Sequence, residues 1–149
     1  MKIELIDIKD LKLDKKNARK HPQKNLDQIK YSLENYGQQK PIVIKDNVVV
    51  AGNGTLMAAK DLGWDKIACV RSELTGSNLA AYALVDNRST ETSEWDMVQL
   101  PETLKILFED GINLEALGFS QSDLAEALEE DKPKTDPKTK TCPHCGEIL

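Results

Sequence analysis

The chain has 149 residues and a formal net charge of −5, and 40% of its residues are apolar and 30% charged. This length allows one domain with a sizeable core and a small appendage, and no apolar run approaches the roughly 20 residues of a membrane helix, which argues against a membrane-spanning chain. The N-terminal segment lacks the uninterrupted apolar core of a signal peptide, so we expect a cytoplasmic protein.

The first half of the chain alternates predicted strands and helices. Residues 3–8 alternate apolar and polar side chains at the period of a strand, and residues 25–36 repeat apolar side chains at helical spacing, with Asn25 as the expected cap. Two β-branched runs flank Asp46-Asn47, a pair typical of a hairpin turn. The other predicted elements are the hairpin strands over residues 41–45 and 48–52, a helix over about 55–62 and a strand over 66–70. We therefore expect an α/β (α+β) fold, a mixed sheet with flanking helices.

The second half is predicted to be helical and acidic. Amphipathic patterns predict helices over residues 77–88, 101–108 and 120–128. Residues 1–72 carry 14 Lys and Arg against 9 Asp and Glu, whereas residues 73–130 carry 2 against 13. The predicted organisation is a main domain over residues 1–92, a helical extension over 93–130, and a flexible linker and tail over 131–149.

The uneven charge predicts different partners for the two halves. The basic run between Lys9 and Lys30 is either a solvated face or a surface that meets phosphate, including that of DNA. Residues 98–130 contain one Lys and eight acidic residues, so we expect a protein partner there rather than a DNA-reading helix.

The stretch AGNGT, residues 51–55, joins the second hairpin strand to a helix. Glycines before a helix N-terminus let an anion approach unpaired backbone N–H groups, which is the general design of phosphate sites. Glycine at such a junction is also used simply for its backbone angles. The turn is neither a Walker loop nor a full GxGxxG motif, so both interpretations stand at this point.

The order of motifs, NARKHP, then GQQKPIV, AGNGTLMAA and finally DNR, resembles the N-terminal domain of the ParB family, within the ParB/sulfiredoxin superfamily. Arg19 stands where that family has a loop arginine, and Asp86-Asn87-Arg88 stands at its later helix. The resemblance covers roughly residues 3–90. The compact AGNG form followed by DNR and WD is similar to the short ParB-like domains of bacteriophages and mobile elements.

This resemblance implies a nucleotide-binding fold. A triphosphate, CTP or ATP with Mg²⁺, would lie between the glycine turn and arginines from the loop and the later helix. The implied phosphate-binding residues are Arg19, Lys20, Gly52, Asn53, Gly54, Thr55 and Arg88. Members of the superfamily include nucleotide-gated DNA clamps, nucleases and phosphoryl-transfer enzymes, and fold alone does not choose among them.

The sequence departs from the family pattern at the turn itself. Asn53, Gly54 and Thr55 stand where ParB has Glu-Arg-Arg, so two phosphate-binding charges are missing and we expect weaker triphosphate binding. The reactive cysteine of sulfiredoxin is replaced by Asn53, so sulfinic-acid reduction is not expected. Cys69 falls within a predicted strand and is expected to be a core residue.

Two classes of function follow from these residues. The favoured one is a nucleotide- or DNA-binding module in phage or mobile-element DNA metabolism. The alternative is an enzyme on the same fold, a nuclease or a nucleotide hydrolase (NTPase), with Asp86 or Glu91 as the carboxylate.

The tail contains Cys142 and Cys145 in a CPHC sequence. Two thiolates at this zinc-knuckle-like spacing provide half of a four-ligand Zn²⁺ site, which two chains would complete as a homodimer. The alternative is a tail without metal.

Overall fold

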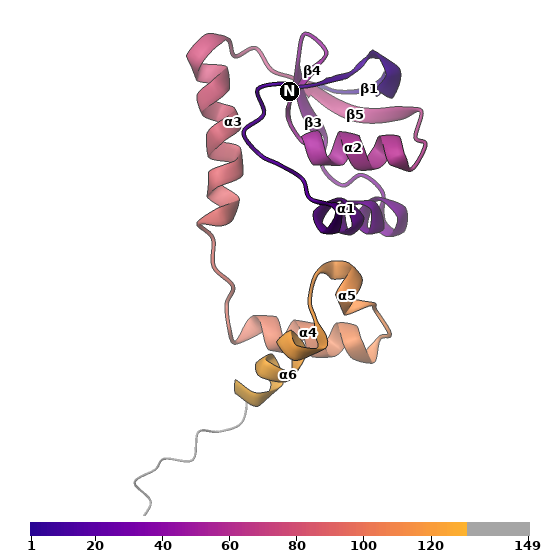
Figure 1. Ribbon diagram of the computed structural model, residues 1–149, viewed down its shortest axis with the longest axis vertical. Helices are drawn as coiled ribbons and strands as arrows, with labels where there is room; N and C mark the ends of the chain where they lie inside the picture. The colour runs from indigo at the N-terminus through magenta and orange to yellow at the C-terminus, as the bar shows by residue number, and fades with distance from the viewer. Residues whose placement is uncertain (131–149) are drawn as a thin grey trace, which may run out of the picture. The chain divides into compact units, whose positions relative to one another are not determined.

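The computed structural model describes the backbone of residues 1–130 and the side chains of residues 1–125. Its elements are β1 (Ile3–Asp7), a 3-10 helix η1 (Ile8–Asp10), β2 (Lys12–Leu13), α1 (Gln23–Tyr36), β3 (Ile42–Lys45), β4 (Val48–Ala51), α2 (Asn53–Asp61), β5 (Lys66–Arg71), α3 (Gly76–Glu91), α4 (Gln99–Glu109), α5 (Leu114–Leu117) and α6 (Gln121–Glu130) (Figure 1). They form two compact units. The first comprises Met1–Glu94 with Ala116–Gly118, and the second Trp95–Glu115 with the described residues from Phe119 on.

The first unit is built on a mixed five-stranded sheet with the order β1-β5-β3-β4-β2. β1 and β5 are antiparallel, as are β3 and β4, whereas β3 runs parallel to β5 and β2 parallel to β4. The predicted hairpin is confirmed: Asp46 and Asn47 both have positive φ, 49° and 61°, the conformation that a two-residue hairpin turn demands. The predicted α/β fold class with a mixed sheet is therefore confirmed.

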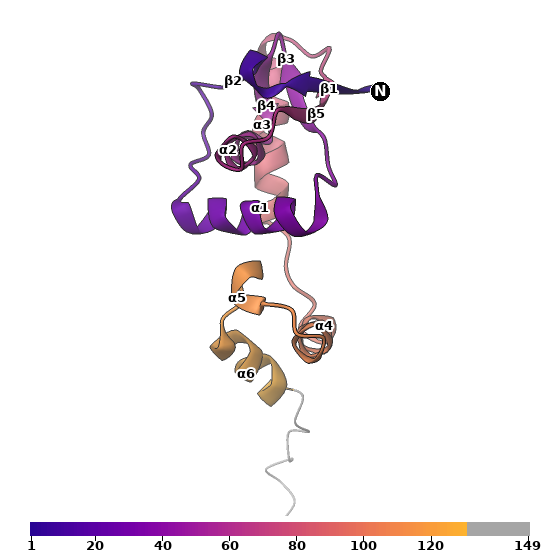
Figure 2. The same cartoon turned by 90° about the vertical axis from the view of Figure 1, so that its right-hand side faces the viewer.

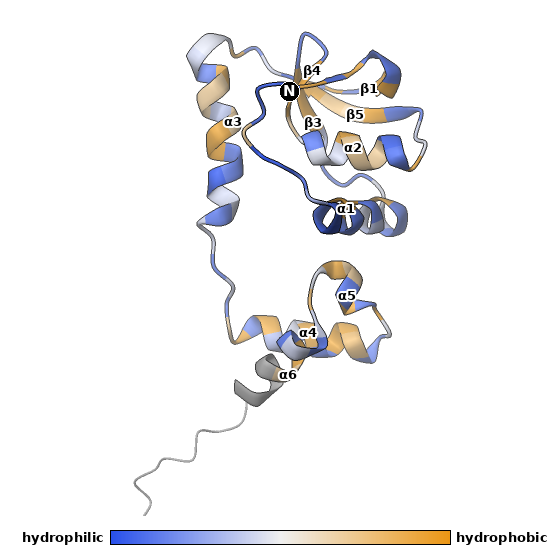
Figure 3. Cartoon of the chain, in the orientation of Figure 1, coloured by the Kyte–Doolittle hydropathy of each residue, from blue (hydrophilic) through white to orange (hydrophobic). Residues whose placement is uncertain are grey.

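Two helices cover one face of this sheet in layers. Both views place α2 between the sheet and α1 (Figures 1 and 2), and strands β3, β4 and β5 of the sheet are largely hydrophobic (Figure 3). The buried core consists of Ile8, Leu11, Leu33, Ile42, Ile44, Val49, Leu56, Ala58, Ala59, Ile67 and Cys69. Cys69 is fully buried, and this burial raises the pKa of its thiol, so its interpretation as a core residue is confirmed.

An ion pair joins the two stacked helices at their outer edge. Lys30 Nζ of α1 lies 2.7 Å from Asp61 Oδ2 of α2, and this hydrogen bond raises the pKa of Lys30. The α3 helix contacts β4 and buries none of its residues fully.

Several boundaries differ from the sequence prediction. Asn25 does not cap α1, because the helix begins at Gln23 and the Asn25 side chain bonds to His21 instead. The α2 helix begins at Asn53, two residues before the predicted start. The segment between α4 and α6, predicted as a connection, contains the single turn of α5. Within the described part, every helix is too short or too polar to cross a lipid bilayer.

Asp96 fixes the start of α4 in the second unit. Backbone N–H groups of Val98 and Gln99 donate to Asp96 Oδ1 at 2.8 and 3.1 Å, and these bonds lower the pKa of the carboxyl group below 3.8. A lowered folded-state pKa means that the ionised group stabilises the fold above about pH 3.8, and that this contribution is lost as the pH falls through the lower, folded-state pKa.

We expect Asp96→Ala to lower the midpoint of thermal unfolding near neutral pH, because two N–H groups lose their acceptor. The difference from the wild type should shrink as the pH falls below about 3.8. Circular-dichroism melts between pH 2 and pH 7 measure both effects, and Asp96→Asn, which keeps an acceptor oxygen, is the control. Equal melting of all three proteins at pH 7 would contradict this role.

Candidate functional site

The junction between β4 and α2 depends on a glycine. Gly52 has φ 97° and ψ 26°, a left-handed conformation that side chains other than glycine rarely adopt. A Cβ atom built there would lie 2.5 Å from Ile42 Cγ2. Gly52 is therefore required for the corner itself, both by its backbone angles and by its packing on β3.

The first turn of α2 presents unpaired backbone donors. The first intrahelical bond runs from Leu56 N–H to the Gly52 carbonyl, so the N–H groups of Asn53, Gly54 and Thr55 have no acceptor within the helix. These groups carry the positive end of the helix dipole. The corner thus also supplies the donors that an anion requires.

A pocket of about 490 Å³ opens at this helix N-terminus. Its lining includes five of the seven phosphate-binding residues implied by the sequence, namely Arg19, Gly52, Asn53, Gly54 and Thr55. Lys20 and Arg88 are exposed and do not line it. The other lining residues are Asn17, His21, Asn25, Ile29, Lys40, Val50, Ala51, Asp86, Asn87 and Thr90.

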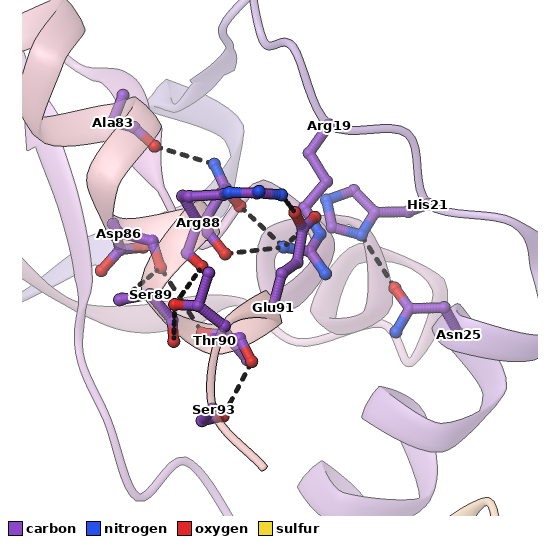
Figure 4. Close-up of polar contacts among 12 residues, drawn as sticks. Arg19, His21, Asn25, Ala83, Asp86, Arg88, Ser89, Thr90, Glu91 and Ser93 are labelled. Atoms are coloured by element: carbon purple, nitrogen blue, oxygen red, sulfur yellow. Dashed lines mark hydrogen bonds and ion pairs between the residues drawn. The ribbon is translucent and has the colours of Figure 1, made fainter.

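Arg19 reaches the pocket from the loop before α1 and is tied to α3. Its Nη1 donates to the backbone carbonyl of Asn87 at 3.3 Å and to Asn87 Oδ1 at 3.5 Å. Nη1 also lies 3.5 Å from Glu91 Oε1 (Figure 4). About 37% of the Arg19 side chain remains exposed, so the guanidinium keeps access to a ligand.

The Asn53 side chain is buried and bonded to the protein. It is 5% exposed; its Oδ1 accepts from Asp14 N–H at 3.2 Å, and its Nδ2 donates to the Val49 carbonyl at 3.3 Å. Asn53 is the first residue of α2 and does not have positive φ, so it does not occupy the left-handed region. Its side chain joins the loop, β4 and α2, so only its backbone N–H is available to an anion.

Two cationic or titratable residues of the pocket were not predicted as site residues. His21 packs over Gly54, where a Cβ would lie 2.8 Å from its ring, and its Nδ1 lies 2.8 Å from Asn25 Oδ1. Lys40 stands two residues before β3 and lines the pocket because the hairpin places the start of β3 beside the end of β4, with Val43 opposite Ala51. The predicted hairpin was the one sequence feature from which the position of Lys40 beside the glycine turn could have been inferred.

The Asp86-Asn87-Arg88 segment, predicted as the end of a helix over residues 77–88, lies inside α3, which continues to Glu91. Asp86 lines the pocket, whereas Arg88, two residues later, points elsewhere and bonds to Glu91, as helical spacing predicts. Within the described residues no group of three or more His, Cys, Asp or Glu side chains gathers as a metal site. Cys142 and Cys145 lie outside the described residues.

A second, more apolar pocket of about 530 Å³ adjoins the first. It lies between α3 and the sheet, and its apolar lining comprises Ala18, Val48, Val50, Leu79, Ala80, Ala83 and Leu84. Asn17, Val50 and Asn87 line both pockets.

The sequence matches no protein-family model and no curated protein sequence. Solved structures do match. The C-terminally truncated chromosome-partitioning protein ParB from Caulobacter crescentus, complexed with CTP-gamma-S, aligns at a TM-score of 0.69 and 18% identity, over 86% of this chain and 77% of that chain. A Pnob8-like ParB-N domain aligns at 0.51 and 20% identity, over 72% of this chain and 45% of that chain.

Sulfiredoxin from Arabidopsis thaliana aligns at a TM-score of 0.47 and 18% identity, over 56% of this chain and 98% of that chain. At the identities of the two ParB structures, likeness establishes the fold and not the activity. The chain therefore has a ParB/sulfiredoxin-like fold, as its motif order predicted.

Proposed function

We propose that the first unit binds a nucleotide, with the phosphates at the N-terminus of α2 and against Arg19. The observation that carries this proposal is that one pocket combines the free N–H groups of α2 with a half-exposed arginine. Helix N-termini and guanidinium groups both hold phosphate well, through backbone N–H groups with the helix dipole and through bidentate charge-assisted hydrogen bonds. The ParB structure with CTP-gamma-S, which shares this fold, supports the same ligand class.

The adjoining pocket favours a nucleotide over a bare phosphate. Its apolar lining provides a place for a ring and a sugar, and the shared residues Asn17 and Asn87 stand between the two pockets as donors and acceptors. Asp86 is the carboxylate in the phosphate pocket, so Mg²⁺ would be held by Asp86 together with phosphate oxygens.

The resemblance and the charge distribution support a proposal for the wider role. We assign the protein to phage or mobile-element DNA metabolism, with the basic run between Lys9 and Lys30 facing DNA and the acidic second unit facing a basic protein partner. A zinc-bridged homodimer through Cys142 and Cys145 remains a separate prediction for the tail.

Calorimetric titration with CTP, ATP and ADP, in Mg²⁺ at low salt, tests nucleotide binding. We expect saturable binding that weakens roughly 10- to 100-fold in Arg19→Ala, because a charge-assisted hydrogen bond contributes about 1.5–3 kcal/mol. Lys20→Ala is the matched control: the adjacent, exposed cation lies outside the pocket and should change affinity less than about threefold.

The two variants separate a built site from general charge attraction. Equal losses of affinity in Arg19→Ala and Lys20→Ala would show nonspecific attraction to a basic loop. If no nucleotide binds, the glycine turn has only a structural role.

A further inference from the structure

Glu91, the last residue of α3, is shared between two arginines. Its Oε1 lies 3.5 Å from Arg19 Nη1, and its Oε2 accepts a hydrogen bond from Arg88 Nη1 at 3.1 Å. Figure 4 shows the two guanidinium groups reaching this carboxylate from different segments, the loop before α1 and α3 itself. The Glu91 carboxylate thus forms an ion pair with Arg19, the arginine on which the proposed phosphate site depends.

Helix stability does not explain this carboxylate. The C-terminal end of a helix carries partial negative charge, so an acidic residue is unfavourable there. The contact between Glu91 and Arg88 spans three residues within the helix and compensates only part of this effect, because surface pairs contribute little. The contact with Arg19, 72 positions away in the sequence, is the one that reaches the pocket.

We infer that Glu91 is a built-in competitor that lowers the affinity of the nucleotide site by occupying Arg19. This inference rests on the proposed function. A phosphate approaching Arg19 must displace the Glu91 carboxylate or bind beside a like charge, and either costs affinity. The Arg19 and Glu91 side chains are 37% and 49% exposed, so their ion pair is weak enough for a polyphosphate to displace.

Arg88 has the opposite effect in this arrangement. Its side chain is 72% exposed, lies outside the pocket lining and holds the second oxygen of Glu91. Arg88 therefore offsets part of the Glu91 charge and gives the carboxylate a partner when a phosphate displaces it from Arg19, which favours ligand binding without contact with the ligand. Arg88 and Glu91 are positioning residues, and Arg19 is the residue that contacts phosphate.

The test compares ATP and CTP titrations of the full chain with those of Glu91→Gln. We expect Glu91→Gln to bind roughly 2- to 5-fold more tightly, because one neutral amide replaces the competing charge at similar size and an exposed ion pair is worth at most about 1 kcal/mol. Glu94→Gln removes the same charge three residues further on and is the matched control, with a change of less than about twofold. Thermal unfolding of Glu91→Gln should match or exceed that of the wild type, so the gain does not come from misfolding.

A double-mutant cycle tests the role of Arg88. Arg88→Ala should weaken binding several-fold in the wild-type background and have no effect in the Glu91→Gln background, since its action passes through Glu91. An equal loss in both backgrounds would make Arg88 a direct phosphate ligand and overturn this part of the inference.

The outcomes also separate the inference from the proposed function. If the wild type binds nucleotide, Arg19→Ala binds it roughly 10- to 100-fold more weakly, and Glu91→Gln binds no more tightly than Glu94→Gln, the role of Glu91 is overturned while nucleotide binding is supported. If Glu91→Gln binds nucleotide and the wild type does not, both the proposed function and the role of Glu91 are supported. No binding by the wild type or by Glu91→Gln overturns both.

Discussion

Gly52→Ala is expected to destabilise the protein by roughly 2–5 kcal/mol. The φ of 97° at this position costs an alanine about 1–2 kcal/mol of backbone strain. The added Cβ would also lie 2.5 Å from Ile42 Cγ2, in a core where Ile42 is only 2% exposed, and overpacking of this kind costs about 1–3 kcal/mol. Urea denaturation followed by circular dichroism measures the loss.

Gly63→Ala separates the two contributions. Gly63 also has positive φ, 72°, but a Cβ there would meet no heavy atom within 4 Å. This variant should lose only the backbone term, about 1 kcal/mol. Equal losses in Gly52→Ala and Gly63→Ala would show that Ile42 moves aside freely and that packing on β3 does not require the glycine.

Asn53→Ala is expected to destabilise the protein by roughly 2–4 kcal/mol, although the residue stands in the turn predicted to bind phosphate. The change leaves the Asp14 N–H and the Val49 carbonyl without their partner, and an unsatisfied buried group costs about 1–3 kcal/mol. The backbone N–H of residue 53 is retained. Nucleotide binding, measured at a temperature where the variant is folded, should therefore change little.

Asn35→Ala is the matched control for this substitution. Asn35 is exposed on α1 and its side chain bonds only within its own helix, to the Tyr31 carbonyl at 2.8 Å. Its loss should cost less than about 0.5 kcal/mol. If Asn53→Ala were as stable as Asn35→Ala yet failed to bind nucleotide, Asn53 would be a ligand residue and its structural role would be wrong.

The fold could be predicted from the sequence because its signals are local. The Asp46-Asn47 pair specifies its hairpin through backbone angles that few residues adopt, and the period-two pattern of residues 3–8 specifies β1. The prediction that Asn25 caps α1 was wrong because its side chain bonds to a competing partner, His21, in the preceding loop. Such competition between a cap and a neighbouring group depends on loop geometry, which periodicity does not encode.

The site was predictable only in part, because motif order identifies its residues but not the directions of their side chains. Arg19 and the glycine turn follow from motif order, whereas the sequence does not show that Arg19 points into the pocket and Lys20 out of it. The separation of Asp86 from Arg88 follows from helical spacing once α3 is known to continue to Glu91. Lys40 joins the site only through the pairing of β3 with β4.

The sheet order also governs how the chain folds. Among the described strands β1 pairs with β5 alone, so that Ile3 lies opposite Val70, whereas β3 and β4 are neighbours in sequence. During synthesis the first strand must wait until about residue 71 has left the ribosome before it finds its partner, and such non-local pairing slows folding. In the interval the backbone N–H and C=O groups of β1 are unpaired, beside Ile3 and Leu5, which stay exposed even after folding, so Lys at either position should lower co-translational aggregation.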